Sequence, residues 1–126
     1  MFEILAGMEA FDVLGVPARR RILELLAGGE RSAGELAAIV GDEFGISQPA
    51  VSQHLRVLRD HGFTNVRPSG TLRLYAVDPA ALDGVEAWIA DLRRAWDQRL
   101  DALGTELARG RKAHRSVGTT RQRRTS

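Results

Sequence analysis

The chain has 126 residues, a formal net charge of +2 and no cysteine. This length predicts one domain with a real hydrophobic core, and the lack of cysteine excludes disulfides, thiolate metal ligands and thiol nucleophiles. No apolar run approaches the roughly 18–20 residues that cross a bilayer, and the acidic N-terminus lacks the basic start of a signal peptide. We therefore expect a cytoplasmic protein without a membrane partner.

The charge is distributed unevenly along the chain. Residues 109–126 hold seven Arg or Lys and no acid, which leaves a net charge of −5 on residues 1–108. We interpret residues 1–108 as the folded domain and residues 109–126 as a basic, disordered tail without apolar periodicity. Such a tail can be a solvated end, with a minor contribution to nonspecific contact with a polyanion.

Helices are predicted in the first half of the chain from apolar residues at spacings of three and four. Ser32 and Glu35 have the spacing of a capping box, and Ser47 has the position of an N-cap. Residues 41–45 contain two glycines and are predicted to form a turn. The expected helices cover about 3–14, 17–27, 33–40 and 48–61.

After Gly62 the apolar pattern changes to alternation. Residues 63–67 and 72–77 are predicted strands of a hairpin, with a turn at 68–71. Asp78 caps a last helix that reaches about residue 108. The expected fold is mostly α with a small two-stranded β-wing, in the order α-α-α-α-β-β-α.

The fourth helix has an unusual polar face. Val51, Leu55 and Leu58 form its buried stripe, whereas its exposed face carries Gln and Arg side chains, with no acid before Asp60. Such donors suit base edges and phosphates, and the free amides of the helix N-terminus suit a phosphate. Two helices, a tight turn and a hairpin are typical of a winged helix-turn-helix that binds DNA. The alternative is an ordinary solvated helix face.

Three runs of sequence carry a family resemblance: VPARRRILELLAGGERSAGELA (16–37), SQPAVSQHLRVLRDHG (47–62) and VRPSGTLRLYAVDP (66–79). Over roughly residues 8–108 the chain resembles the ArsR family of bacterial winged-helix repressors. The resemblance implies a homodimer held by the first and last helices and bound to a palindromic operator, an inverted repeat near its own promoter. It also implies that Gln48, Ser52, Gln53 and Arg56 face double-stranded DNA.

The resemblance does not extend to metal sensing. Metal-sensing members place a Cys pair near the recognition element, or Asp and His pairs on the last helix. This chain has no Cys, and residues 78–108 contain no His. The chain is similar to a metal-free branch found in actinobacteria that has a Trp, here Trp96, in the final helix. No metal and no cofactor are expected.

Two sets of residues are expected to carry the function. The DNA-binding set lies at the start and on the outer face of the fourth helix and in the wing: Ser47, Gln48, Ala50, Ser52, Gln53, Arg56, Arg67, Ser69 and Arg73. The dimer set lies in the first and last helices, whose apolar stripe is large for one domain to bury: Leu5, Phe11, Val85, Trp88, Ile89, Leu92, Trp96 and Leu100. The alternative is that the last helix packs only against its own domain.

The sequence therefore predicts a dimeric transcriptional repressor. No catalytic residues are expected, because no nucleophile-elbow or phosphate-loop motif occurs, and His54 and His61 are too far apart to share a metal without a partner segment. Two alternatives remain open. One is a regulator that binds a small-molecule effector at the dimer interface near Trp88 and Trp96. The other is a helix-turn-helix module used for protein–protein contact.

Overall fold

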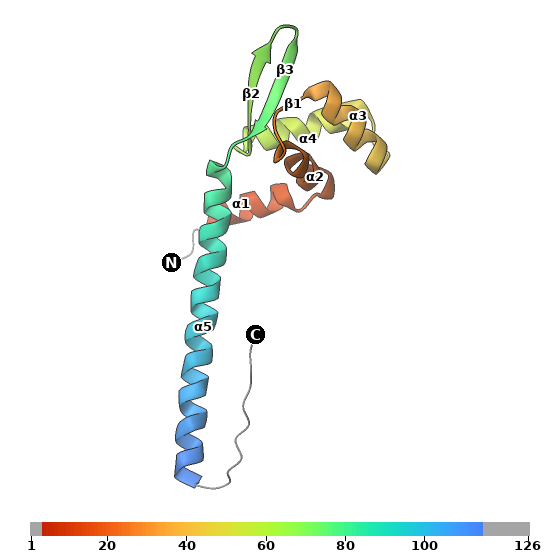
Figure 1. Cartoon of the computed structure of the whole chain (residues 1–126). Coiled ribbons are helices and arrows are strands. Elements are labelled where there is room, and N and C mark those ends of the chain that lie inside the picture. Colours follow the sequence, from red (N-terminus) through yellow and green to blue (C-terminus); the bar gives the residue numbers. More distant parts are fainter. Residues whose placement is uncertain (1–3, 115–126) are drawn as a thin grey trace. The chain divides into compact units, whose positions relative to one another are not determined.

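The computed structural model describes residues 4–114, and the side chains of residues 9–110. The chain divides into two compact units, residues 1–89 and residues 90–126. The described elements (Figure 1) are, in chain order, α1 (Ile4–Leu14), α2 (Pro17–Leu26), β1 (Arg31–Ser32), α3 (Ala33–Phe44), α4 (Gln48–Asp60), β2 (Thr64–Ser69), β3 (Leu72–Val77) and α5 (Ala80–His114).

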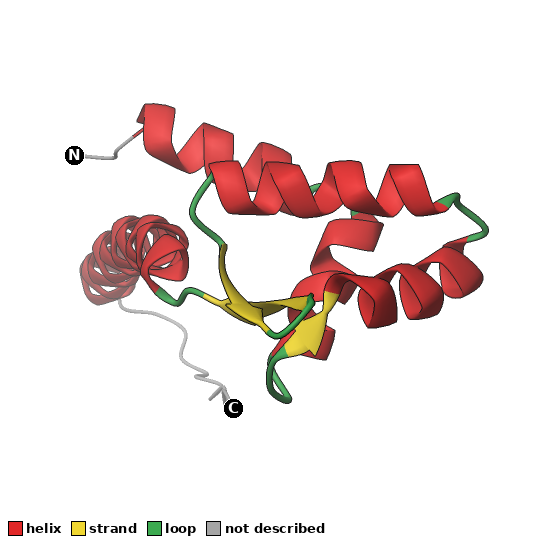
Figure 2. Cartoon of the chain, turned by 90° about the horizontal axis from the view of Figure 1, so that it is seen from above, coloured by secondary structure: helices red, strands yellow, loops and turns green. Residues whose placement is uncertain are grey.

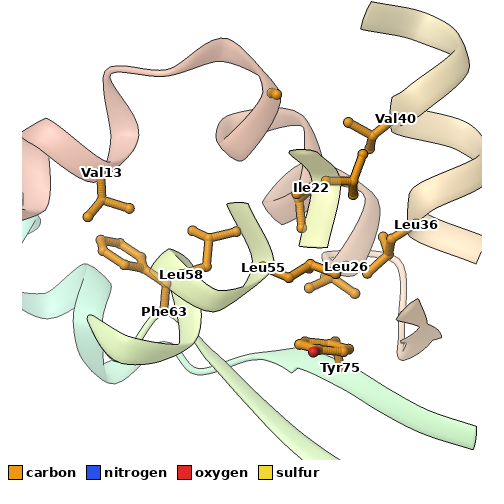
Figure 3. Close-up of a cluster of buried hydrophobic side chains, with 11 residues drawn as sticks. Val13, Ile22, Leu26, Leu36, Val40, Leu55, Leu58, Phe63 and Tyr75 are labelled. Carbon is orange, nitrogen blue, oxygen red and sulfur yellow. The ribbon is translucent and has the colours of Figure 1, made fainter. Parts of the chain in front are cut away.

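Helices α1–α4 pack around one cluster of apolar side chains. Ile22, Leu36 and Leu58 are completely buried, and Phe63 and Tyr75 extend the cluster to the sheet. Figure 3 shows side chains from these helices converging on the cluster, with the Tyr75 ring at the side of the sheet. Fully burying such a side chain contributes about 1.5–3 kcal/mol. The core therefore fixes the orientation of α4, whose buried stripe (Val51, Leu55, Leu58) is the one expected from the sequence.

The sheet has three strands in the order β1-β3-β2, all antiparallel. The expected hairpin is present, and Gly70 has the positive φ (63°) that its tight turn requires. The hairpin projects beyond α2–α4 (Figure 1), and the strands lie beside the helices rather than between two helical layers (Figure 2). The two-stranded wing that the sequence predicted is therefore confirmed, and the strand that was not expected is β1, which pairs only Arg31 and Ser32 with β3. Two residues are too few to produce an alternating pattern in a sequence.

The structure corrects two helix ends. Residues 41–44 belong to α3 and are not a turn; the helix ends at Gly45, which is left-handed (φ 64°) and donates its N–H to the Gly41 carbonyl. Arg21 of α2 holds the added turn through Glu43, at 2.8 and 3.1 Å. Helix α5 continues to His114, so the start of the expected basic tail is helical. The rest of that tail, residues 115–126, lies outside the described residues.

Candidate nucleic-acid interface

A three-residue turn joins α3 to α4 and sets the direction of α4. The Ile46 N–H donates to the Gly41 carbonyl at 3.1 Å. A Cβ atom on Gly41 would lie 3.1 Å from the Ile46 carbonyl oxygen, which is closer than most real contacts. The glycines at 41 and 45 therefore allow a tight turn between the two helices, which is the geometry of a helix-turn-helix.

The N-terminus of α4 has fewer free backbone N–H groups than the sequence indicated. Ser47 is extended, and its Oγ accepts a hydrogen bond from the Ala50 N–H at 3.2 Å, so it is the N-cap that the sequence predicted. Pro49 has no N–H. Among the first three residues of α4, only the Gln48 N–H is therefore left for a phosphate, where several free amides were expected.

The outer face of α4 is a continuous surface of hydrogen-bond donors. Gln48, Ser52, Gln53, Arg56 and Arg59 are all exposed, whereas Ala50 is half-buried at the side of the helix. In the part of the chain that the structure describes, neither arginine forms an ion pair. The face can therefore donate to base edges or phosphates without first breaking an internal contact.

His54 attaches α4 to α2. Its ring is half-buried, and Nδ1 lies 3.2 Å from Arg19 Nε, which donates to it. Burial and then the nearby Arg19 charge lower the pKa of His54 below the ordinary value, so the ring is neutral at pH 7. The structure therefore shows a packing role for His54, with Arg19 as its partner.

The two wing arginines differ in environment. Arg67 is in register with Leu74 and Arg73 with Pro68, so the two side chains point to opposite faces of the hairpin. Arg67 is paired with Glu30, at 2.8 Å for both hydrogen bonds. Arg73 is exposed and has no ion-pair partner among the described side chains. Ser69 is exposed near the wing tip, on the same face as Arg67.

Glu30 was not predicted from the sequence as the partner of Arg67. The two residues are 37 positions apart, and neither belongs to a motif that relates them. They meet because β1, which follows Glu30, and β2, which contains Arg67, both pair with β3. Because strand β1 could not be predicted from the sequence, this pair could not be predicted either.

The expected dimer residues fall into two groups. In the first unit, Phe11 of α1 packs edge-on against Trp88 of α5, with ring centroids 5.0 Å apart, and Val85 is half-buried. Phe11 and Trp88 thus contact each other within one chain. Leu5 lies in α1, but its side chain is outside the described set.

The second group is an exposed apolar stripe along α5. Its large side chains are about half exposed, and Trp96 is 60% exposed. The stripe consists of Ile89, Leu92, Trp96, Leu100, Leu103 and Leu107. Leu103 and Leu107 extend it beyond the expected dimer set.

The spacing of the stripe has a regular period. From Val85 to Trp96, and again from Trp96 to Leu107, apolar residues recur at steps of four, three and four. This is an 11-residue repeat of about 3.67 residues per turn, so the stripe drifts only slowly around α5, in the sense of a slight right-handed supercoil.

Other kinds of site have little support in the described residues. Among them, no group of three or more His, Cys, Asp or Glu could hold a metal ion. No helix of this part is long and apolar enough to span a membrane. A shallow hollow of about 370 Å³ on α5 is lined by Leu92, Ala95, Trp96, Arg99 and Leu103.

The fold and the α4 surface define a winged helix-turn-helix protein of the DNA-binding class. Residues 16–66 match the family described as "Bacterial regulatory protein, arsR family". The chain is 42% identical to the HTH-type transcriptional regulator Rv2034 of Mycobacterium tuberculosis over 91 residues, which cover 72% of this chain and 78% of that protein. The chain therefore belongs to the ArsR family of transcriptional regulators, as its sequence motifs indicated.

Two further relatives agree with this assignment. The transcriptional repressor SdpR of Bacillus subtilis is 30% identical over 90 residues, 71% of this chain and 96% of SdpR. The solution structure of the homodimeric winged helix-turn-helix DNA-binding domain of Mb0332 from Mycobacterium bovis has a TM-score of 0.51 and 26% identity, covering 75% of this chain and 82% of that one. The family and these relatives are regulators and not enzymes, in agreement with the expectation from the sequence.

Proposed function

We propose that this protein is a homodimeric repressor that binds an inverted-repeat operator, including one at its own promoter. The observation that carries the proposal is the outer face of α4, where exposed Gln, Ser and Arg side chains follow a tight helix-turn-helix turn. The family to which the chain belongs and the repressor activity in the name of SdpR support it. Such a repressor would act in the cytoplasm, where bacterial DNA is transcribed.

In this proposal α4 lies in the major groove. Arg56 can bind a guanine through two hydrogen bonds, and Gln48 or Gln53 can bind an adenine in the same way. Ser47, Ser52 and the Gln48 N–H are close to the start of the helix and suit phosphates. Arg73 and Ser69 on the wing would contact the adjacent backbone, and Ala50 would approach the groove through its methyl group only.

Dimerisation is proposed to use the α5 stripe. A row of large apolar side chains that is about half exposed is unfavourable in water, and a second copy would cover it. The homodimeric state of the Mycobacterium bovis domain supports this arrangement. A two-fold dimer would present its two α4 helices about 34 Å apart, or a multiple of this, which matches an inverted repeat.

A small-molecule effector is the second candidate feature. The hollow beside Trp96 is apolar and has one cation, Arg99, at its edge. This composition would suit an apolar acid at the interface between two α5 helices. The hollow is open in a single chain, so such a ligand would need the second copy to cover it.

The test is a fluorescence-anisotropy titration at physiological salt. It compares the DNA upstream of this protein's gene with a shuffled duplex of the same length. We expect the native fragment to bind tighter by about 10³ or more. Equal affinity for both duplexes would contradict an operator at this promoter.

A matched pair of variants tests the role of α4. Arg56→Ala should weaken binding to the native fragment by about 1–3 kcal/mol and reduce discrimination against the shuffled duplex, because it removes a base contact. Arg94→Ala removes the same charge from an exposed side chain of α5 that is paired with Asp91, and it should leave discrimination unchanged. Equal effects of the two variants would contradict base reading by Arg56.

A further inference from the structure

Glu30 and Arg67 form a two-pronged ion pair at the base of the wing. Arg67 donates through Nε and Nη2 to the two carboxylate oxygens of Glu30, both at 2.8 Å. Ser32 and Arg67 are both in register with Leu74, so they lie on one face of the sheet. Glu30 is two residues before Ser32 and reaches the same face. The contact therefore follows from the strand order.

The pair neutralises one of the two cations of the wing. The hydrogen bond from Arg67 lowers the pKa of Glu30, and the same bond raises the pKa of Arg67, so both groups remain charged near neutral pH. Affinity for a DNA backbone grows with the number of phosphates that a protein neutralises through its cations. An arginine that already has a carboxylate partner adds little to that number.

The pair is also open to solvent. The Arg67 side chain is 58% exposed and that of Glu30 is 37% exposed. Ion pairs at such exposure are weak and can be exchanged. A phosphate could replace Glu30 as the partner of Arg67. The unpaired Glu30 carboxylate would then lie beside that phosphate and repel it.

The ion pair is not needed to hold the sheet. Strand β1 is attached to β3 by backbone pairing, with Arg31 opposite Tyr75 and Ser32 opposite Leu74. Ser32 is fixed again by the capping box with Glu35, at 3.0 and 3.1 Å. A purely structural role would therefore add little to contacts that are already made.

We propose that Glu30 is a specificity-determining residue that lowers the affinity of the wing for DNA of any sequence. It does so by occupying Arg67, and it leaves the base-reading face of α4 unchanged. Nonspecific binding depends mainly on phosphate contacts, so weakening the wing contact increases the share of affinity that depends on sequence. This inference rests on the proposed DNA-binding function.

The test uses a random-sequence duplex and a series of salt concentrations, so that no operator needs to be known. Glu30→Gln should bind this duplex up to about fivefold tighter for each wing that contacts it, the range expected for one exposed ion pair. The slope of log affinity against log salt should steepen by about 0.9 for each freed arginine.

Glu43→Gln is the matched control. Glu43 accepts two hydrogen bonds from Arg21, at 2.8 and 3.1 Å, with 39% and 36% of the two side chains exposed. This variant removes the same charge and breaks a pair of the same kind, but away from the wing. It should change the salt slope much less than Glu30→Gln does.

Two arginine variants test the same idea without changing Glu30. Arg73→Gln should reduce the salt slope by about 0.9 for each wing, whereas Arg67→Gln should reduce it less, because Arg67 is already paired. If Glu30→Gln has the affinity and slope of Glu43→Gln, and Arg67→Gln weakens binding as much as Arg73→Gln, the inference is overturned while the proposed function stands. If no form of the protein binds any duplex, the proposed function fails first and the inference fails with it.

Discussion

At the scale of single residues, the contacts around α4 separate side chains that hold the fold from those available to a partner. His54 and Arg56 are two positions apart in α4. His54 is half-buried and accepts from Arg19, whereas Arg56 is exposed and has no ion pair among the described side chains. The difference follows from the helical period, which turns one position toward α2 and the other outward.

The His54 contact predicts a pH dependence of stability. Its pKa is lowered in the folded chain, so the unfolded chain binds a proton first as the pH falls. The contribution of the neutral ring is therefore complete above the ordinary histidine pKa and is lost as the pH falls from there through the lowered folded-state pKa. Urea unfolding at a series of pH values measures this loss.

His54→Asn supplies the comparison, because an amide oxygen can accept from Arg19 and does not titrate. The stability of the original protein should fall more steeply than that of the variant as the pH decreases from 7.5 to below 6. Arg19 is the charged side chain that donates to His54. Parallel pH profiles for the two proteins would contradict the assigned contact.

At the scale of elements, the two helices of the helix-turn-helix start in different ways. Ser32 and Glu35 form a complete capping box in which each side chain binds the backbone of the other, and Ser32 is buried. Ser47 makes a single exposed bond to the Ala50 N–H. A cap that is buried and reciprocal is harder for water to replace than one that is exposed.

Replacement of each cap should therefore have a different cost. Ser32→Ala should lower the free energy of unfolding by about 1–2 kcal/mol, and Ser47→Ala by about 0.5–1 kcal/mol. Chemical denaturation of the two variants, analysed with a common m-value, gives the comparison. An equal or larger loss for Ser47→Ala would mean that burial of the cap does not determine its contribution.

Elements with a strong local signal could be predicted, and those that depend on distant partners could not. The caps at Ser32 and Ser47 and the buried stripe of α4 were predicted correctly, because each depends on residues within one turn of helix. The last turn of α3 was missed because its glycines resemble a loop, whereas the structure stabilises it through Arg21 and a left-handed Gly45. The Glu30–Arg67 pair was not predicted because it depends on strand β1, which pairs with a distant strand. The DNA-binding and dimer residues stay predictions.

At the scale of the whole molecule, the apolar stripe of α5 predicts the state of association. Trp96 is 60% exposed in a single chain, so its removal should change the stability of the isolated fold little. If a second copy covers the stripe, Trp96 would be near the centre of a buried interface, where large aromatic side chains contribute most. Trp96→Ala should therefore raise the dimer dissociation constant by at least about 30-fold, a loss of about 2 kcal/mol.

Sedimentation equilibrium over a range of protein concentrations measures this constant, and circular dichroism verifies that the helices are retained. Leu72→Ala is the matched control, because Leu72 is an exposed apolar side chain of the wing, 53% exposed, and is not part of the stripe. The control should dimerise like the original protein. If Trp96→Ala dimerises as tightly as the control, the second copy does not bury this part of α5, and the proposed homodimer would have to use another surface.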